Sequence, residues 1–425
     1  MSNLATANRN GVLTRNKVTD MGRGVTRFLK DSGYYPHISK VDSTVDGEVT
    51  INGKACVNFY SNSFLGLTNH PKIIEAKKAA LDKYGNGSGS SRMITTQSIL
   101  YELEERIAAF KNRESAIVFS AGMLVNWGVI PALANSSLKP LIRELGGEDL
   151  FAPVSLFLDK FNHSCIHDGA ALSMCNFWAG RAKVHMYEHM DMADLRKELE
   201  NDKNEYKIII TDGVFSIHGH IAPLNEILLL AQEFNAAIYV DDAHGTGVLG
   251  PNGRGTAEEL GIDSEIDIPV GTFSKAFGCA GGFVVGDKDF CDYLRVASRT
   301  YVYQTAMPPE NAGGLIAAID IAEKEPWRRR QVLANATKVR NEFQRLGFST
   351  LGTKFHIVPI LIEDVEVATK IADDLLDQGV ITGCVKPPVA TQPIIRCNMM
   401  ATHTEEHLDR LVSIIETSAN KDGLI

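Results

Sequence analysis

Apolar residues recur along the chain with two spacings, one typical of helices and one typical of buried strands. Helical spacing begins near Pro71 and returns between Leu100 and Phe110. Short apolar runs then alternate with segments of mostly helical spacing: AIVFSA, VSLFLD, KVHMY, YKIIIT, AAIYVDD, DIPVGTF and GGFVVG. Strands that are apolar on both faces are typical of a largely parallel sheet covered by helices. The pattern therefore predicts an α/β fold.

The two ends of the chain depart from this alternation. Residues 1 to about 45 predict an arm and a helix, and Asn52-Gly53 lies between alternating apolar residues, which predicts a β-hairpin. After Pro308-Pro309 come a helix, a longer charged helix and the apolar runs HIVPILIE and PIIRCNMM. We expect an N-terminal arm with a hairpin (1–70), a large domain (71–310) and a small C-terminal α+β domain (311–425).

Composition limits the classes of partner. The net charge is −9 and the basic residues are interleaved with acidic ones, which argues against a nucleic-acid partner. No apolar run approaches the roughly 18 residues that a membrane helix needs. The polar start lacks the apolar middle of a secretory signal, so we expect a cytoplasmic protein. Seven cysteines without C-x-x-C spacing indicate reduced thiols, with neither a disulfide framework nor a metal site.

Candidate chemistry gathers where two of the predicted strands end. The run AIYVDDAHGTGVLG places Asp241 and His244 at the carboxyl end of a strand, where ligands of open α/β sheets bind. Lys275 follows another strand in GTFSKAFGCAGG, and a strand-end lysine among small and hydroxyl residues suggests a Schiff base. Pyridoxal 5'-phosphate (PLP) needs a lysine, an anion beside its ring nitrogen, a partner for its phenolic oxygen and phosphate donors. Asp241, His244, Lys275 and the Thr272 hydroxyl could supply them.

Two of these stretches, VDDAHGTGVLGPNGRG and GTFSKAFGCAGGFVVG, resemble motifs of the α-oxoamine synthases, which are fold-type I PLP enzymes. The similarity runs from VNFYSNSFLGLTNHP to IIRCNMMATHTEEHLDRLV. It implies a homodimer with active sites at the subunit interface. It also implies an acyltransferase that condenses an amino acid with an acyl thioester, expected to be an acyl-coenzyme A, with loss of carbon dioxide. The product would be an α-amino ketone.

The resemblance also implies roles for single residues. Lys275 would hold the cofactor and then act as general base, while Asp241 would support the ring as electron sink. His163, in LDKFNHSCIHDGA, matches the histidine that stacks on the ring, and Ser216 matches a serine near it. His244 completes the catalytic set.

Other matches concern residues expected to bind the cofactor phosphate and the substrate carboxylate. Gly122 and Met123 match the turn whose amides hold the phosphate. Arg396 matches the arginine that clamps the substrate carboxylate, because its planar fork suits bidentate binding, and Asn62 would assist it.

Several positions depart from the family pattern. Met123 replaces an aromatic or similar residue, and Gln304 and Ala306 stand where serine or threonine is usual. This leaves Thr305 as the hydroxyl candidate for a phosphate contact from the neighbouring subunit. His218 and His220 replace acidic residues, so the amino-acid substrate stays open.

Residues 135–153 form a segment longer than in relatives by roughly a dozen residues, and long segments near active sites are often functional. Leu138, Leu141, Ile142 and Leu145 recur at helical spacing and predict an amphipathic helix over LKPLIREL. Because its apolar side needs a partner surface, we expect it near the acyl entrance or the dimer interface.

Alternatives stay open. Another fold-type I reaction, such as aldol cleavage or transamination, would use the same cofactor. A non-catalytic subunit of a heterodimeric synthase is a second possibility, but such relatives typically lack the lysine that Lys275 provides. A small-molecule binding protein with a degenerate site is a third. The amino acid, the acyl length and the carrier are not determined by the sequence.

Overall fold

A computed structural model describes residues 17–35, 38–147, 150–175, 182–352, 354–421 and 423. The seven apolar runs form one sheet in the order β3-β9-β8-β7-β6-β4-β5. Its strands are β3 (Ser115–Phe119), β4 (Val154–Asp159), β5 (Lys183–Tyr187), β6 (Tyr206–Asp212), β7 (Ala236–Asp241), β8 (Ile268–Thr272) and β9 (Gly282–Gly286). Neighbours pair in parallel except around β9, which is antiparallel to β3 and to β8. The predicted α/β fold with a mostly parallel sheet is confirmed.

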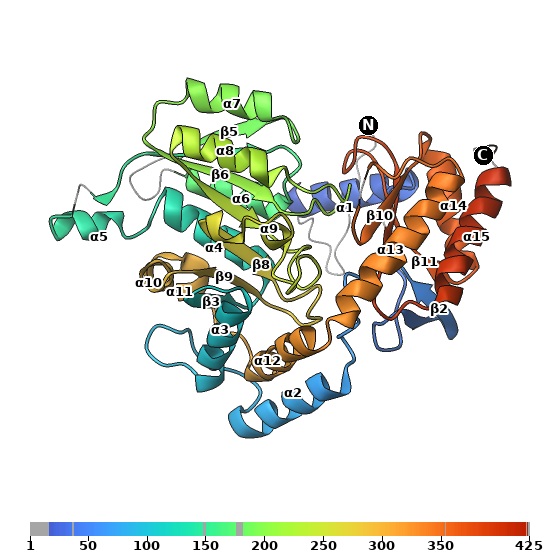
Figure 1. Cartoon of the computed structure of the whole chain (residues 1–425), viewed down its shortest axis with the longest axis horizontal. Helices are drawn as coiled ribbons and strands as arrows, with labels where there is room; N and C mark the ends of the chain where they lie inside the picture. Colours follow the sequence, from blue (N-terminus) through green and yellow to red (C-terminus); the bar gives the residue numbers. More distant parts are fainter. Residues whose placement is uncertain are drawn as a thin grey trace, which may run out of the picture.

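Apart from the edge strand β5, the strands of this sheet are mostly buried on both faces, which explains the continuous apolar runs. In β6, Ile208 and Ile210 join one hydrophobic cluster and Ile209 joins another, as expected for side chains that alternate between faces. The first cluster includes residues of α4 (Gly122–Ala134), α6 (Ser164–Ser173), α10 (Lys288–Ala297) and α11 (Arg299–Val302). The second includes residues of α7 (Met192–Asn201) and α8 (Leu224–Phe234). Figure 1 shows the sheet between these helices.

The hairpin predicted at Asn52-Gly53 is present. Both residues have positive φ, 50° and 77°, as a two-residue type I′ turn requires. The turn joins β1 (Glu48–Ile51) to β2 (Lys54–Asn58), and β2 also pairs in parallel with β11 (Val380–Ile381). The hairpin is therefore hydrogen-bonded to a strand near the end of the chain.

The C-terminal part has its own small sheet, in the order β10-β13-β12. These strands are β10 (Ile357–Leu361), β12 (Gly383–Val385) and β13 (Ile394–Asn398), and the helices are α13 (Trp327–Arg345), α14 (Val365–Asp377) and α15 (Glu405–Lys421). Before them, α12 (Pro309–Lys324) packs against α2 (Pro71–Tyr84) and α3 (Ser98–Phe110). The domain boundaries at residues 70 and 310 stay a prediction.

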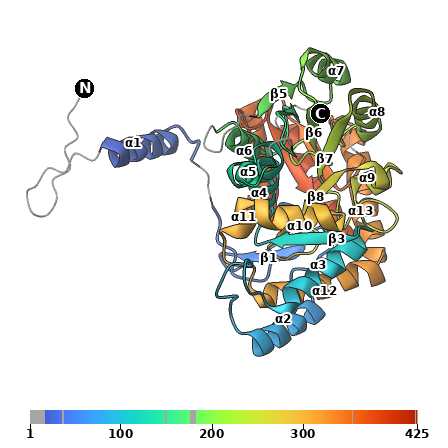
Figure 2. The same ribbon diagram turned by 90° about the vertical axis from the view of Figure 1, so that its left-hand side faces the viewer.

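Two segments stand away from the body. Helix α1 (Lys17–Asp31) has no buried residue and lies apart from the rest of the molecule in Figure 2. Helix α5 (Lys139–Glu144), within the 135–153 segment, projects from the body in Figure 1 and is shorter than the eight residues of LKPLIREL. Leu138 packs against the core, whereas Leu141 and Leu145 are exposed. What covers these leucines in the assembled protein stays a prediction.

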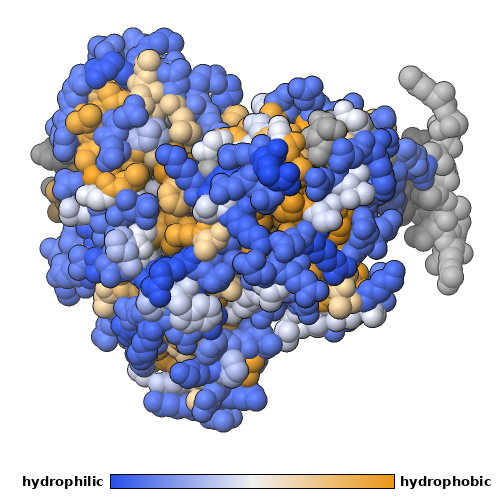
Figure 3. Space-filling view, turned by 45° about the vertical axis from the view of Figure 1, so that its right-hand side comes forward, coloured by the Kyte–Doolittle hydropathy of each residue, from blue (hydrophilic) through white to orange (hydrophobic). Residues whose placement is uncertain are grey.

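The surface in Figure 3 is mainly hydrophilic, with smaller apolar patches. In the described part of the chain, no helix combines the length and the apolar character needed to cross a bilayer. All seven cysteines are free, as predicted.

Candidate active site

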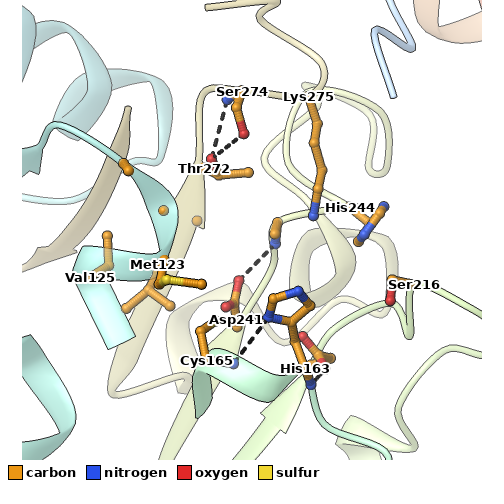
Figure 4. Close-up of a pocket in the computed structure, with 16 residues that line it drawn as sticks. Met123, Val125, His163, Cys165, Ser216, Asp241, His244, Thr272, Ser274 and Lys275 are labelled. Carbon is orange, nitrogen blue, oxygen red and sulfur yellow. Dashed lines mark hydrogen bonds between the residues drawn. The ribbon is translucent and has the colours of Figure 1, made fainter. Parts of the chain in front are cut away.

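A cavity of about 300 Å³ lies where β6, β7 and β8 end and where α4 and α6 begin. Figure 4 shows it. Its lining contains eight of the residues that the sequence singled out, namely Gly122, Met123, His163, Ser216, Asp241, His244, Thr272 and Lys275, together with Cys165, Asp212, Ser274 and others. Strands far apart in sequence thus bring the predicted site residues together.

Asp241 is held by a chain of hydrogen bonds that starts in the sheet. The Tyr239 hydroxyl donates to Asn126 Oδ1 at 2.5 Å, and Asn126 Nδ2 donates to Asp241 Oδ2 at 2.7 Å. Asp241 Oδ1 accepts from the Ala243 amide at 3.1 Å. Tyr239 fixes which way the Asn126 amide points, so the Asp241 carboxylate has one preferred orientation.

A second carboxylate lies beside the first. Asp212 is directly opposite Asp241 in the parallel register of β6 and β7, and its Oδ2 accepts from the His163 amide at 2.7 Å. Burial and the charge of Asp241 raise the pKa of Asp212 well above its usual value. Asp212 is therefore protonated more readily than an ordinary aspartate.

Lys275 enters the cavity from the loop after β8, with its amine directed towards His163 and His244 in Figure 4. Loss of water contact lowers the pKa of Lys275 to about 8, although Asp241 and Asp212 oppose this shift. The neutral amine, which is the nucleophile and the base, is therefore more populated near neutral pH than in an ordinary lysine.

The two histidines differ in exposure. His163 exposes its ring to the cavity, and its Nδ1 lies 2.9 Å from Cys165 Sγ. Burial, and then the charge of Lys275, lowers the pKa of His163. His244 is 4% exposed, and burial lowers its pKa well below the usual value. Among the described residues, His244 Nδ1 has no hydrogen-bond partner.

The first turn of α4 closes one side of the cavity. Gly122 and Met123 begin the helix, so their amides have no intrahelical acceptor and carry the positive end of the helix dipole. A Cβ on Gly122 would come within 2.9 Å of Thr272 Oγ1, so only glycine lets the helix approach β8. Thr272 Oγ1 donates to the Gly281 carbonyl and lies 2.8 Å from Ser274 Oγ.

Three predicted residues lie outside this lining. Arg396 Nη2 donates to Asn62 Oδ1 at 3.3 Å, and Asn398 Nδ2 donates to the same oxygen at 3.1 Å. Arg396 is 8% exposed, its Nε has no partner among the described residues, and burial lowers its pKa to about 10. Thr305 is exposed, and its carbonyl accepts a 3.5 Å bond from Ser120 Oγ. The structure thus pairs Arg396 with Asn62 but does not bring Thr305 into the cavity.

Asp242 fixes the loop that carries His244. Its carboxylate accepts from the Thr256 hydroxyl at 2.5 Å and from the Thr246 hydroxyl at 3.1 Å, and Lys111 Nζ lies 3.7 Å away. Asp242 is 3% exposed. A Cβ on Gly255, whose φ is 118°, would overlap the Asp242 carboxylate. The conformation of this loop therefore depends on the Asp242 carboxylate, and the position of that carboxylate requires a glycine at Gly255.

Comparison with known proteins identifies the family. The model for "Aminotransferase class I and II" matches residues 54–415. The chain belongs to this family. It is 37% identical to 8-amino-7-oxononanoate synthase of Geotalea daltonii, over 93% of this chain and 97% of that protein, and 36% identical to 8-amino-7-oxononanoate synthase 1 of Bacillus subtilis, over 93% and 96%.

Solved structures agree. Serine palmitoyltransferase from S. paucimobilis with bound PLP matches with a TM-score of 0.86 and 30% identity, covering 97% of this chain and 100% of that chain. The 8-amino-7-oxononanoate synthase from Francisella tularensis matches with a TM-score of 0.71 and 25% identity, covering 87% and 99%. Within the aminotransferase class I and II family, the chain is an α-oxoamine synthase, a PLP-dependent acyltransferase that forms a carbon–carbon bond.

The residues present fit this cofactor. A lysine amine, a buried carboxylate and a helix N-terminus surround one cavity, and the partnerless His244 Nδ1 is a buried polar atom for which a bound group would supply a partner.

Several residues that line this cavity or support it from behind its lining were not predicted from the sequence. Asp212 ends the strand YKIIITD in the same way that Asp241 ends its own strand, so the same rule could have found it. Asn126 carries a weaker signal, a buried amide in an otherwise apolar stretch of α4. Nothing in the sequence pairs Lys111 with Asp242.

We predict that Lys111→Met destabilises the protein by about 3 kcal/mol, because it leaves the Asp242 carboxylate buried without its cation. The double variant Lys111→Met with Asp242→Asn should lose less, since neither charge remains. Urea unfolding followed by circular dichroism measures both. Additive losses in the double variant would contradict the pairing.

Proposed function

We propose that this α-oxoamine synthase joins alanine to a seven-carbon dicarboxylic acyl thioester. The observation that carries the proposal is the cavity with Lys275, Asp241 and His163, in a chain whose similarity to 8-amino-7-oxononanoate synthases extends over 93% of its length. The name of that product gives the substrates. An amine on carbon 8 next to the terminal methyl group comes from alanine, and carbons 1 to 7 come from the acyl group.

Each of the cavity residues has its own proposed role. PLP, when bound, supplies an electron sink for the bond that breaks at the α-carbon of the amino acid. Asp241, oriented by Asn126, would keep a proton at the ring nitrogen. The exposed face of His163 would pack on the ring, and His244 Nδ1 would bond the phenolic oxygen. The first amides of α4 and the Thr272 and Ser274 hydroxyls would bind the phosphate. Ser216 would border the ring.

Lys275 would move protons in two steps. With the amino acid bound in the cavity, the neutral Lys275 amine would take the proton from its α-carbon. The α-carbon would then bond to the acyl carbonyl, the thiolate would leave and take up a proton, and the carboxylate would be lost as carbon dioxide. Lys275 would return its proton to the α-carbon, which would give the α-amino ketone.

Arg396 and Asn62 would hold the amino-acid carboxylate until decarboxylation. Arg396 is buried and has an unpartnered Nε, so an incoming carboxylate would complete its hydrogen bonds. The Asn62 oxygen that accepts from Arg396 Nη2 would keep the guanidinium in position.

A second candidate reaction condenses serine with a long acyl thioester. It is favoured by the TM-score of 0.86 with serine palmitoyltransferase, which exceeds the 0.71 with a solved 8-amino-7-oxononanoate synthase. His218 and His220 follow Ser216 closely, and the loop departs from the acidic family pattern at both positions.

A homodimer in the cytoplasm is part of the proposal. Helix α1 exposes Val18, Met21, Val25 and Phe28 along its length, and an apolar helix face of this kind is stable when another surface covers it. In the dimer, Thr305 would contact the cofactor phosphate of the partner subunit. The free, mostly buried cysteines suit a reducing compartment.

The substrate proposal is tested by thiol release from a matrix of amino acids and acyl thioesters. We predict the highest kcat/KM with alanine and the seven-carbon dicarboxylic thioester. Preference for serine and a long acyl chain would support the second candidate, and no thiol release with any amino acid would reject both.

Arg396→Lys should raise the KM for the amino acid by about tenfold or more, because a single ammonium cannot replace the two-pronged guanidinium contact. The KM for the acyl thioester should stay within about twofold of wild type, since the clamp binds only the amino acid. Steady-state kinetics with each substrate varied in turn measures both constants. Equal changes in the two would contradict the carboxylate clamp.

A further inference from the structure

Three histidines lie close to one another, outside the lining of the cofactor cavity. His189 follows β5, and His218 and His220 lie in the loop that follows β6. All three are only partly exposed. The roles proposed for the cavity residues use none of them.

Hydrogen bonds join two of these histidines to a buried carboxylate. Asp159, which ends β4 and is 1% exposed, has its Oδ1 2.9 Å from His189 Nδ1, and His189 Nε2 lies 2.9 Å from His220 Nδ1. Asp159 also accepts from the amides of Phe161 at 2.8 Å and Met190 at 2.9 Å. We call Asp159, His189 and His220 the histidine chain. It ties together the loops after β4, β5 and β6.

Ring packing strengthens the same connection. The Phe161 ring stacks on His189, with centroids 4.4 Å apart and planes 17° apart, and on His218 at 4.9 Å and 18°. Phe215 meets His189 edge-on at 4.4 Å. His220 also stacks on His189, with ring centroids 5.2 Å apart. Five rings from three loops therefore form one packed group.

Two of the three loops carry residues of the cofactor cavity. Phe161 is two positions before His163, and His218 is two positions after Ser216. Both His163 and Ser216 line the cavity. A shift of either loop would therefore move a cavity wall.

The bonding pattern restricts how many protons the histidine chain holds. With both imidazoles neutral, His189 donates from Nδ1 to Asp159, so its Nε2 must accept from His220 Nδ1. One further proton is tolerated, because either ring can donate across the 2.9 Å contact. With both rings charged, two N–H groups face each other and the bond is lost.

The surrounding charges do not offset a second proton. In the part of the protein that the structure describes, Asp159 is the one carboxylate bonded to the histidine chain, and Lys160 and Glu188 on the same loops pair with each other at 2.8 Å. Burial lowers the pKa of His220, and burial and then the neighbouring His220 and His189 lower the pKa of His218 to about 4. Because burial and then the neighbouring His189 hold the pKa of His220 below its ordinary 6.5, acid below pH 6.5 favours states in which these two rings separate.

We propose that the histidine chain is a positioning device that holds His163 and Ser216 against the cofactor and releases them when a second proton enters. This proposal rests on the proposed positions of His163 and Ser216 at the cofactor, and it does not depend on the identity of the substrates.

The test measures PLP binding to the apoprotein between pH 7.5 and 5, with hydrogen exchange of the loops as an independent readout. His220→Phe keeps a flat ring but removes the bond to His189, whereas His220→Asn keeps a side-chain N–H donor. We expect His220→Phe to bind PLP about tenfold more weakly at pH 7.5, as the loss of one buried hydrogen bond implies, and to exchange faster in 161–163 and 215–220. His220→Asn should stay within about threefold of wild type at pH 7.5 and lose less affinity in acid.

His185→Phe is the matched control. His185 bonds Glu198 and Asp202 and stacks on Phe157 at the same sheet, and neither it nor these three partners line the cavity. The variant His185→Phe should lower the free energy of unfolding, and the pH dependence of its PLP binding should match that of wild type. Wild-type affinity and acid response in His220→Phe, or an equal loss of affinity in His185→Phe, would overturn the proposal. If His220→Phe does not fold, His189→Gln replaces it and is judged by the same outcomes.

Discussion

The register between β6, β7 and β8 is the constraint on which the site depends. Asp212 and Asp241 are direct partners across two parallel strands, and Thr272 ends the next strand. A slip of one residue would turn each side chain to the opposite face of the sheet. The apolar residues of β6 and β7 are buried on both faces, so their packing holds the register that presents both carboxylates to one cavity.

Two neighbouring acids in a cavity need compensation, and the chain supplies it in several ways. A raised pKa favours the neutral form of Asp212, and Lys275 and the start of α4 bring positive charge to the same space. Asp242, the next residue, points its carboxylate into the loop and is balanced by Lys111. The two successive acids at the end of β7 therefore have different roles. Asp241 faces the cavity, and Asp242 fixes the loop that positions His244.

Much of this could be predicted from the sequence because it depends on local patterns. Apolar runs predicted the seven strands, and Asn52-Gly53 predicted the hairpin. Strand-end position and cofactor chemistry predicted four residues of the cavity lining, and motif similarity predicted four more. The rest depends on contacts between distant segments. The Tyr239–Asn126–Asp241 bonds join α4 to β7, and the histidine chain joins three loops, so no periodicity reveals either. Helix α5 is shorter than its apolar spacing suggests, because Leu145 lies in a turn after Glu144.

The central claim is that Lys275 holds the cofactor, and borohydride reduction followed by peptide mass mapping tests it most directly. Reduction fixes PLP to whichever lysine carries it. The geometry predicts the added mass on the peptide that contains Lys275 and none on the peptide that contains Lys111, a buried lysine close to Asp242. Labelling of a lysine other than Lys275, or no labelling of a PLP-saturated sample, would contradict the account.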